Sequence, residues 1–137
     1  MGRWVHFDDG DQYKFWFGTQ SSEDITSFGG ATEKIEYYDE ELDEDIVNED
    51  MIAVHWNRKR HQPKIKAEIK ALEKMLKANN LTYNECMKRQ DPEWCRSNPN
   101  RDLPEIDWKV VARLNLGYII LDHLEKREDV YCEAEYY

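Results

Sequence analysis

The first eighteen residues alternate between aromatic and polar side chains, and this pattern most narrows what the chain can fold into. The segments RWVHF and QYKFWF flank the turn sequence DDGD. Alternation with a period of two is typical of a β-strand, and Asp-Gly between two such runs indicates a β-hairpin. The turn can have two or three residues. We favour three, because this register gathers five apolar side chains on one face: Val5, Phe7, Tyr13, Phe15 and Phe17.

Two tryptophans fall on the opposite face of this hairpin. A shift of one residue in register would turn every side chain to the other face, and the favoured register leaves Trp4 and Trp16 away from the apolar set. These indoles need a second layer of structure or a binding partner to cover them. Because Trp is over-represented where the free energy of binding is concentrated, we predict that Trp4 and Trp16 are apolar anchors for a partner.

Two longer segments carry apolar residues at helical spacing. A helix is predicted over about 63–78, with Pro63 at its first position and a stripe of apolar residues along one side. The stripe is formed by Ile65, Ile69, Leu72 and Leu76. A second helix is predicted over about 104–127. Apolar residues occur on most sides of it, so it should be central and largely buried. Gly117 lies in its middle, which predicts a close approach by a neighbouring element.

The remaining segments complete an α+β prediction. TEKIEYY, residues 32–38, alternates like a strand, whereas the spacing of Leu42, Ile46, Val47 and Met51 favours an acidic amphipathic helix. Residues 52–56 form a short apolar run that we interpret as a strand, and the tail 130–137 alternates like an edge strand. We therefore expect a small antiparallel sheet, led by the N-terminal aromatic β-hairpin and packed against the two main helices. Its 137 residues fit a single domain spanning 1–137.

Charge is strongly segregated along the sequence. Residues 1–57 hold fifteen acidic and three basic side chains, residues 58–77 hold two and eight, and residues 78–137 hold twelve and eight. The run EYYDEELDEDIVNED, residues 36–50, has nine carboxylates and no basic residue. Either the basic segment neutralises the acidic one inside the fold, or both are presented to partners.

The acidic run supports the leading functional hypothesis. A folded carboxylate face is either a solubilising surface or a docking surface for a basic partner. We hypothesise a non-catalytic interaction protein, adaptor-like or inhibitor-like, that docks on a basic surface, most simply that of another protein. The predicted contacts are Trp4, Trp16, Asp39, Glu40, Glu41, Asp43, Glu44 and Asp45. The sequence does not separate imitation of duplex phosphates from simple acidity.

Two alternative functions remain open. The basic segment 58–77 is predicted to contact nucleic-acid phosphates, without sequence readout, if the protein is nucleic-acid-associated. Its predicted phosphate ligands are Arg58, Lys59, Arg60 and Lys64. A small enzyme is the second alternative, although the sequence has none of the common nucleophile, metalloprotease or P-loop motifs and offers no catalytic residue to name.

Residue spacing argues against a metal or cofactor. Asp8, Asp9 and Asp11 fail the ligand pattern of an EF-hand and are typical of a hairpin turn, while the histidines and cysteines lack the spacing of a structural zinc site. We therefore predict no metal and no cofactor. His123, near the end of the last helix, suits the helix dipole and is assigned no other role.

The cysteine count and the hydropathy bear on the compartment. The chain has three cysteines, and a small, odd number argues against a disulfide framework and favours a reducing compartment. No apolar run approaches the roughly 20 residues that span a bilayer, and the N-terminus lacks a secretory signal. We expect a cytoplasmic protein without membrane contact, and the sequence leaves its oligomeric state open.

Overall fold

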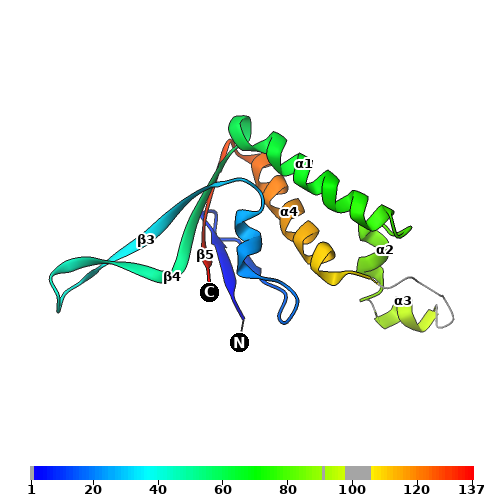
Figure 1. The fold of residues 1–137 in the computed structure, drawn as a ribbon, viewed down its shortest axis with the longest axis horizontal. Helices are drawn as coiled ribbons and strands as arrows, with labels where there is room; N and C mark the ends of the chain where they lie inside the picture. Colours follow the sequence, from blue (N-terminus) through cyan, green and yellow to red (C-terminus); the bar gives the residue numbers. More distant parts are fainter. Residues whose placement is uncertain (1, 91, 98–105) are drawn as a thin grey trace.

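The computed structural model describes residues 2–90, 92–97 and 106–137, and it has the predicted α+β fold. A five-stranded antiparallel sheet, in the order β2-β1-β5-β4-β3, carries helices on one face (Figure 1). The strands are β1 (Trp4–Phe7), β2 (Gln12–Lys14), β3 (Ala31–Asp39), β4 (Glu44–Asn57) and β5 (Asp129–Glu135). The helices are a short 3₁₀ helix (Ser22–Thr26), α1 (Arg58–Lys77), α2 (Tyr83–Lys88), α3 (Pro92–Ser97) and α4 (Trp108–Lys126). None of the helices in these ranges is long and apolar enough to cross a membrane.

The N-terminal hairpin has the three-residue loop. Val5 lies opposite Tyr13, and the amide of Phe7 donates to the carbonyl of Asp11 at 2.9 Å across the loop. Gly10 supplies a φ of +95°, which glycine adopts without a steric penalty. Four of the five predicted apolar side chains are buried, but the prediction for Phe17 was wrong. β2 ends at Lys14 and the chain turns away, so the Phe17 side chain is 80% exposed.

The segment from Asp39 to Met51 belongs to a second β-hairpin, so the predicted acidic helix was wrong. β3 pairs with β4 as far as Asp39 opposite Glu44. The carboxylate of Asp39 accepts the amide hydrogens of Glu41 and Leu42 at 2.9 and 3.2 Å, which closes the turn. A helix would place like charges three and four residues apart on the same surface, whereas this turn favours strands and the β-branched residues that follow it suit β4.

α1 begins at Arg58, five residues before the predicted start at Pro63. β4 runs directly into it, and the side chain of Asn57 caps it by accepting the amide hydrogen of Arg60 at 3.1 Å. Pro63 therefore lies inside the helix, where it leaves the carbonyl of Lys59 without its usual donor. The predicted apolar stripe is buried and is confirmed: Ile65, Ile69, Leu72 and Leu76.

α4 is the central helix, as predicted. It begins at Trp108 with Asp107 as its cap; the predicted start at Pro104 lies outside the described residues. Gly117 faces the ring of Phe28 and Ile69 of α1, and a Cβ atom at this position would lie 2.7 and 3.1 Å from them. The close approach expected at this glycine is confirmed.

β5 is a central strand rather than the predicted edge strand. It pairs with β1 on one side and with β4 on the other. Val130, Cys132 and Ala134 face the helices and are fully buried. These small side chains let the helices pack closely over the middle of the sheet. The alternation of charged residues in the tail did not indicate that this strand is central.

Candidate functional site

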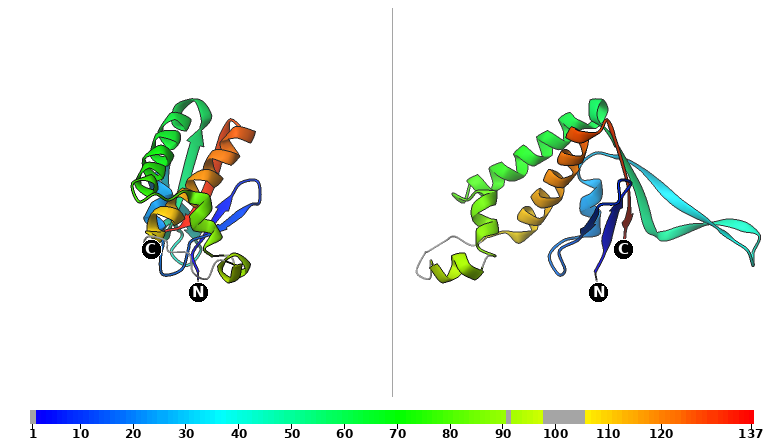
Figure 2. Two further views of the ribbon diagram at one scale, coloured as in Figure 1. Left: turned by 90° about the vertical axis from the view of Figure 1, so that its right-hand side faces the viewer. Right: turned by 180° about the vertical axis from the view of Figure 1, so that it is seen from behind.

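Seven of the nine carboxylates of the acidic run lie on a two-stranded ribbon formed by residues 35–48, which we call the arm. β5 pairs with β4 only over Met51–Asn57, whereas β3 and β4 remain paired far beyond that point. The register is interrupted where Lys34 lies opposite Ile52 but Ile35 lies opposite Asn48. From this irregularity the arm projects out of the sheet, away from the helices (Figures 1 and 2).

The two faces of the arm carry different side chains. The register places Ile35, Tyr37 and Ile46 on one face, which forms an apolar strip. Tyr37 and Tyr38 are 51% and 55% exposed, and Leu42 at the tip is 60% exposed. No helix of the described chain covers either face (Figure 2). The arm therefore presents apolar side chains that the chain itself leaves open.

Carboxylates frame this strip. Residues 35–48 contain seven acidic side chains and no basic one. All six of the predicted docking carboxylates lie at the tip or beside it: Asp39, Glu40, Glu41, Asp43, Glu44 and Asp45. The hydroxyl of Tyr38 donates to the carboxylate of Asp43, and this bond raises the pKa of Tyr38 above its usual value. The structure thus brings the predicted carboxylates together on one projecting element.

The predicted indole anchors lie elsewhere. Trp4 is on β1, which β5 and β4 separate from β3. Trp4 is partly exposed on the sheet face away from the helices, with the Lys14 ammonium 5.7 Å from its ring centroid. Trp16 follows β2 and packs partly against the core. Neither indole joins the carboxylates of the arm.

The apolar side chains that do accompany the carboxylates were missed from the sequence. They are Tyr37, Tyr38 and Leu42. The adjacent tyrosines in the strand-like alternation of residues 32–38 were the available signal, because Tyr is enriched among the residues that contribute most to binding. The residues that follow fit an amphipathic helix as well as a strand, so the sequence alone does not place these tyrosines on an exposed ribbon.

The basic segment forms a row of lysines on the outside of α1. Lys59, Lys66, Lys70 and Lys77 recur at the spacing i, i+7, i+11 and i+18, which aligns them along the helix, and Lys74 lies next to them. All five are exposed. An open groove lies beside the C-terminal half of the row and is lined by Lys70, Glu73, Lys74, Lys77 and Ala78. We call these five lysines the lysine row.

The predicted phosphate ligands divide into two kinds. Arg58 is occupied inside the fold, since its guanidinium donates to the carbonyls of Leu124 at 2.6 Å and Glu125 at 3.2 Å. Lys59, Arg60 and Lys64 are exposed. None of the ion pairs between described residues joins the arm to α1. The charge segregation seen in the sequence therefore remains unneutralised in the fold.

The hairpin loop and α4 meet at a cluster of Asp9, Asp11 and His123, whose possible ligand atoms lie within 4.8 Å of one another. His123 Nε2 is 3.3 Å from Asp9 Oδ2 and 3.1 Å from Asp11 Oδ2, and its ring stacks on Phe7. The amide of Asp11, with help from His123 and Arg127, holds the pKa of Asp9 below its usual value. An imidazole and a guanidinium thus already pair with these carboxylates. The cluster ties the loop to α4, a structural role for His123 that its sequence position did not indicate.

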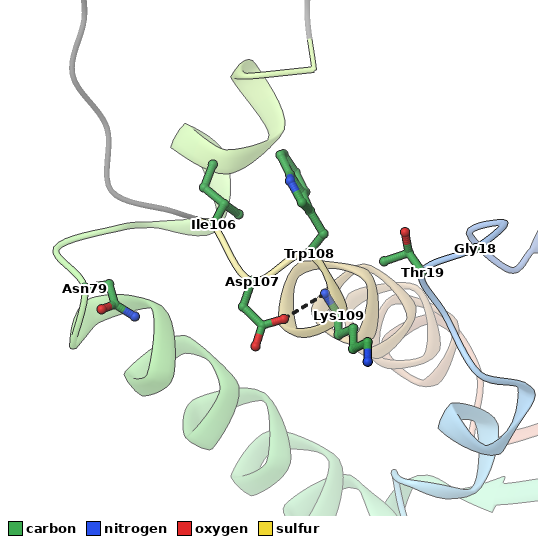
Figure 3. A pocket seen from close by; sticks show the side chains of 7 residues that line it. All are labelled: Gly18, Thr19, Asn79, Ile106, Asp107, Trp108 and Lys109. Atoms are coloured by element: carbon green, nitrogen blue, oxygen red, sulfur yellow. Dashed lines mark hydrogen bonds between the residues drawn. The ribbon is translucent and has the colours of Figure 1, made fainter.

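A cavity of about 690 Å³ lies beside the start of α4 (Figure 3). Gly18, Thr19, Asn79 and residues 106–109 line it. Its charged lining residues are Asp107 and Lys109, and the Asp107 carboxylate is engaged in accepting the Lys109 amide hydrogen at 3.1 Å (Figure 3). This lining does not supply the converging titratable groups on which acid–base catalysis depends.

Comparison of the chain with models of known protein families, with curated proteins and with solved structures found no match.

Proposed function

We propose that this chain is a non-catalytic interaction protein, adaptor-like or inhibitor-like, whose arm docks on a basic surface of another macromolecule. One observation carries the proposal. The arm leaves the sheet as a two-stranded ribbon with seven carboxylates, no basic residue and an uncovered apolar strip.

Stability supports a docking role for the arm. A two-stranded ribbon is marginally stable in water when nothing packs against it. Ile35, Tyr37 and Ile46 share one face, and none of them is fully buried. A partner that covers this strip supplies burial that the chain does not provide, at roughly 25 cal/mol for each Å² of apolar surface removed from water.

The carboxylates and the aromatic rings would act at different stages of binding. Carboxylates raise the rate of encounter with a basic surface and orient it. Desolvated tyrosines slow dissociation, because aromatic side chains concentrate the free energy of binding. Trp4 and Trp16 remain predicted anchors for a contact separate from the arm.

The arm is short and densely charged. Its paired strands cover residues 35–39 and 44–48, a rise of about 13 Å at roughly 3.3 Å per residue, and residues 40–43 form the turn beyond them. Seven carboxylates on an element of this size give it a strongly negative potential, which complements a basic protein surface.

A charge-neutralised arm tests the proposal. The arm-neutral variant carries Asp39→Asn, Glu40→Gln, Glu41→Gln, Asp43→Asn, Glu44→Gln and Asp45→Asn. The control variant has the same net charge but neutralises exposed residues elsewhere: Glu23, Glu33, Asp122, Glu125, Glu128 and Glu133. Capture from native lysate over a salt series should show partners lost at low salt from the arm-neutral variant and retained by the control. Equal capture by the wild-type and arm-neutral proteins at every salt concentration would leave the arm as a merely solvated surface.

Phosphate contact through α1 is the alternative function, favoured by the exposure of Lys59, Arg60 and Lys64. It implies weak binding to duplex DNA that falls steeply with salt. Because Arg58 is used inside the fold, only the three exposed cations should be changed to Glu in its test. Unchanged DNA binding by that variant would remove the alternative.

A further inference from the structure

We infer that a second copy of this chain is a partner of the arm, and that the arm of one copy lies along the lysine row of another. This inference rests on the proposed role of the arm. It adds the surface to which the arm binds. This surface is the outer face of α1, with Lys59, Lys66, Lys70, Lys74 and Lys77.

Charge complementarity is the first argument. The arm has seven carboxylates and no cation, and the lysine row has five ammonium groups. Glu68 and Glu73 are the only acidic residues of α1, and Glu68 is partly buried. Each copy therefore holds a strongly acidic and a strongly basic strip, and no ion pair between described residues joins the two.

The two strips also suit each other in size and in chemistry. The lysine row extends over 18 residue steps of helix, or about 27 Å at roughly 1.5 Å per residue, which is long enough for the arm, whose paired strands rise about 13 Å before the turn. The groove beside the C-terminal half of the row is lined by three lysines, Ala78 and Glu73. Lysine stems offer aliphatic carbon below their charged ends, so the groove suits the apolar strip of Ile35, Tyr37 and Ile46.

One chain cannot make this contact with itself. β4 passes directly into α1 at Asn57, and α1 and the arm lie on opposite sides of the sheet and diverge from each other (Figures 1 and 2). The contact therefore requires two copies. Reciprocal exchange of arms gives a closed dimer, and a one-way contact gives longer assemblies.

The overall charge of each copy determines the salt concentration at which self-association should be measured. A net charge of −10 on each copy opposes approach at long range. At physiological ionic strength the Debye length is about 8 Å, so this repulsion is largely screened while pairs in contact still attract. The association is therefore measured at about 0.15 M salt.

A charge-swap experiment on the full chain tests the inference. The arm-reversed variant carries Glu40→Lys, Glu41→Lys and Glu44→Lys. The row-reversed variant carries Lys66→Glu, Lys70→Glu and Lys77→Glu. A control variant reverses three exposed carboxylates away from both strips, Glu125, Glu128 and Glu133. Circular dichroism establishes that each variant is folded before sedimentation equilibrium measures its association.

The wild-type protein and the control variant should self-associate, and each strip variant alone should associate more than about tenfold more weakly. An equimolar mixture of the two strip variants should recover association, because the unaltered arm of the row-reversed copy then meets the unaltered lysine row of the arm-reversed copy. A monomeric wild-type protein, undiminished association of either strip variant, or a mixture that fails to recover would each overturn the inference. If the wild-type protein is monomeric but the arm-neutral variant still loses partners from lysate, this inference fails and the proposed function stands.

Discussion

His61 lies where β4 turns into α1, and its side chain is part of that junction. Its Nδ1 accepts the amide hydrogen of Asn57 at 2.8 Å. Burial, reinforced by Arg60 and His55, lowers the pKa of His61 below its usual value. The side chain of Asn57 also donates to the carboxylate of Asp129 at 3.0 Å, so the start of α1 and the start of β5 share these contacts. The junction favours the neutral form of the ring.

This junction makes stability depend on pH in a defined direction. The unfolded chain protonates His61 near pH 6.5, at a higher pH than the folded protein does, so the unfolded state binds more protons in this range. The free energy of unfolding should therefore fall as the pH is lowered below about 6.5. His61→Gln should flatten that part of the curve, as measured by urea unfolding at a series of pH values. An unchanged slope in the variant would contradict this role of His61.

At the scale of elements, the arm differs from every other strand pair in its independence from the core. None of its residues is buried. The irregularity between Lys34 and Ile35 separates the arm from the part of β3 and β4 that belongs to the sheet. The remainder of β4 lies between β3 and β5 and contributes the fully buried Val54 and Trp56. One end of β4 is therefore packed in the core, and the other end is exposed to solvent.

Removing the arm should leave the body of the protein intact. Because Ile35 lies opposite Asn48, residues 36–47 can be replaced by a two-residue Asn-Gly turn. We expect the free energy of unfolding in urea to change by less than about 1 kcal/mol, since no buried contact is lost. A shortened chain without a cooperative transition would show instead that the arm is integral to the fold. Partner capture and self-association should both be lost from the shortened chain.

Local patterns in the sequence predicted the elements whose partners are near in sequence or whose burial is one-sided. The N-terminal hairpin follows from its turn and alternation, and α1 from the stripe that includes Ile65 and Leu72. The arm could not be recognised in this way, because Leu42, Ile46 and Val47 fit a helix as well as a strand until Asp39 is seen to close a turn. The docking carboxylates were nevertheless identified, since their charge does not depend on the element that carries them. Trp4 was placed with them because sequence distance says little about which side chains a sheet brings together.

For the whole molecule, β5 is the strand that unites the sheet. The hairpin of β1 and β2 and the hairpin of β3 and β4 do not pair with each other, and β5 lies between them. It is paired to β1 through Val5 opposite Ala134 and to β4 through Val54 opposite Cys132. The prediction that residues 1–137 form one domain depends on this strand.

A chain ending at Glu128 should therefore lose cooperative unfolding and its near-ultraviolet circular dichroism. A chain that lacks only Tyr136 and Tyr137 is the matched control and should keep both, because β5 remains whole. Adding a synthetic peptide of residues 128–137 to the truncated chain should restore the transition. A cooperative transition in the truncated chain without the peptide would contradict the central role of β5.

The position of β5 also determines when the protein can fold during synthesis. Of the five strands, β5 leaves the ribosome last, about 120 residues after β1, a delay on the order of 6 to 25 seconds at roughly 5–20 residues per second. During that interval both hairpins are present without the strand that joins them, and inward side chains such as Val5, Val54 and Trp56 are uncovered. Like charges on neighbouring nascent chains repel one another, so we expect the net negative charge of residues 1–57, which are made early, to slow aggregation of the unfinished sheet until β5 is added.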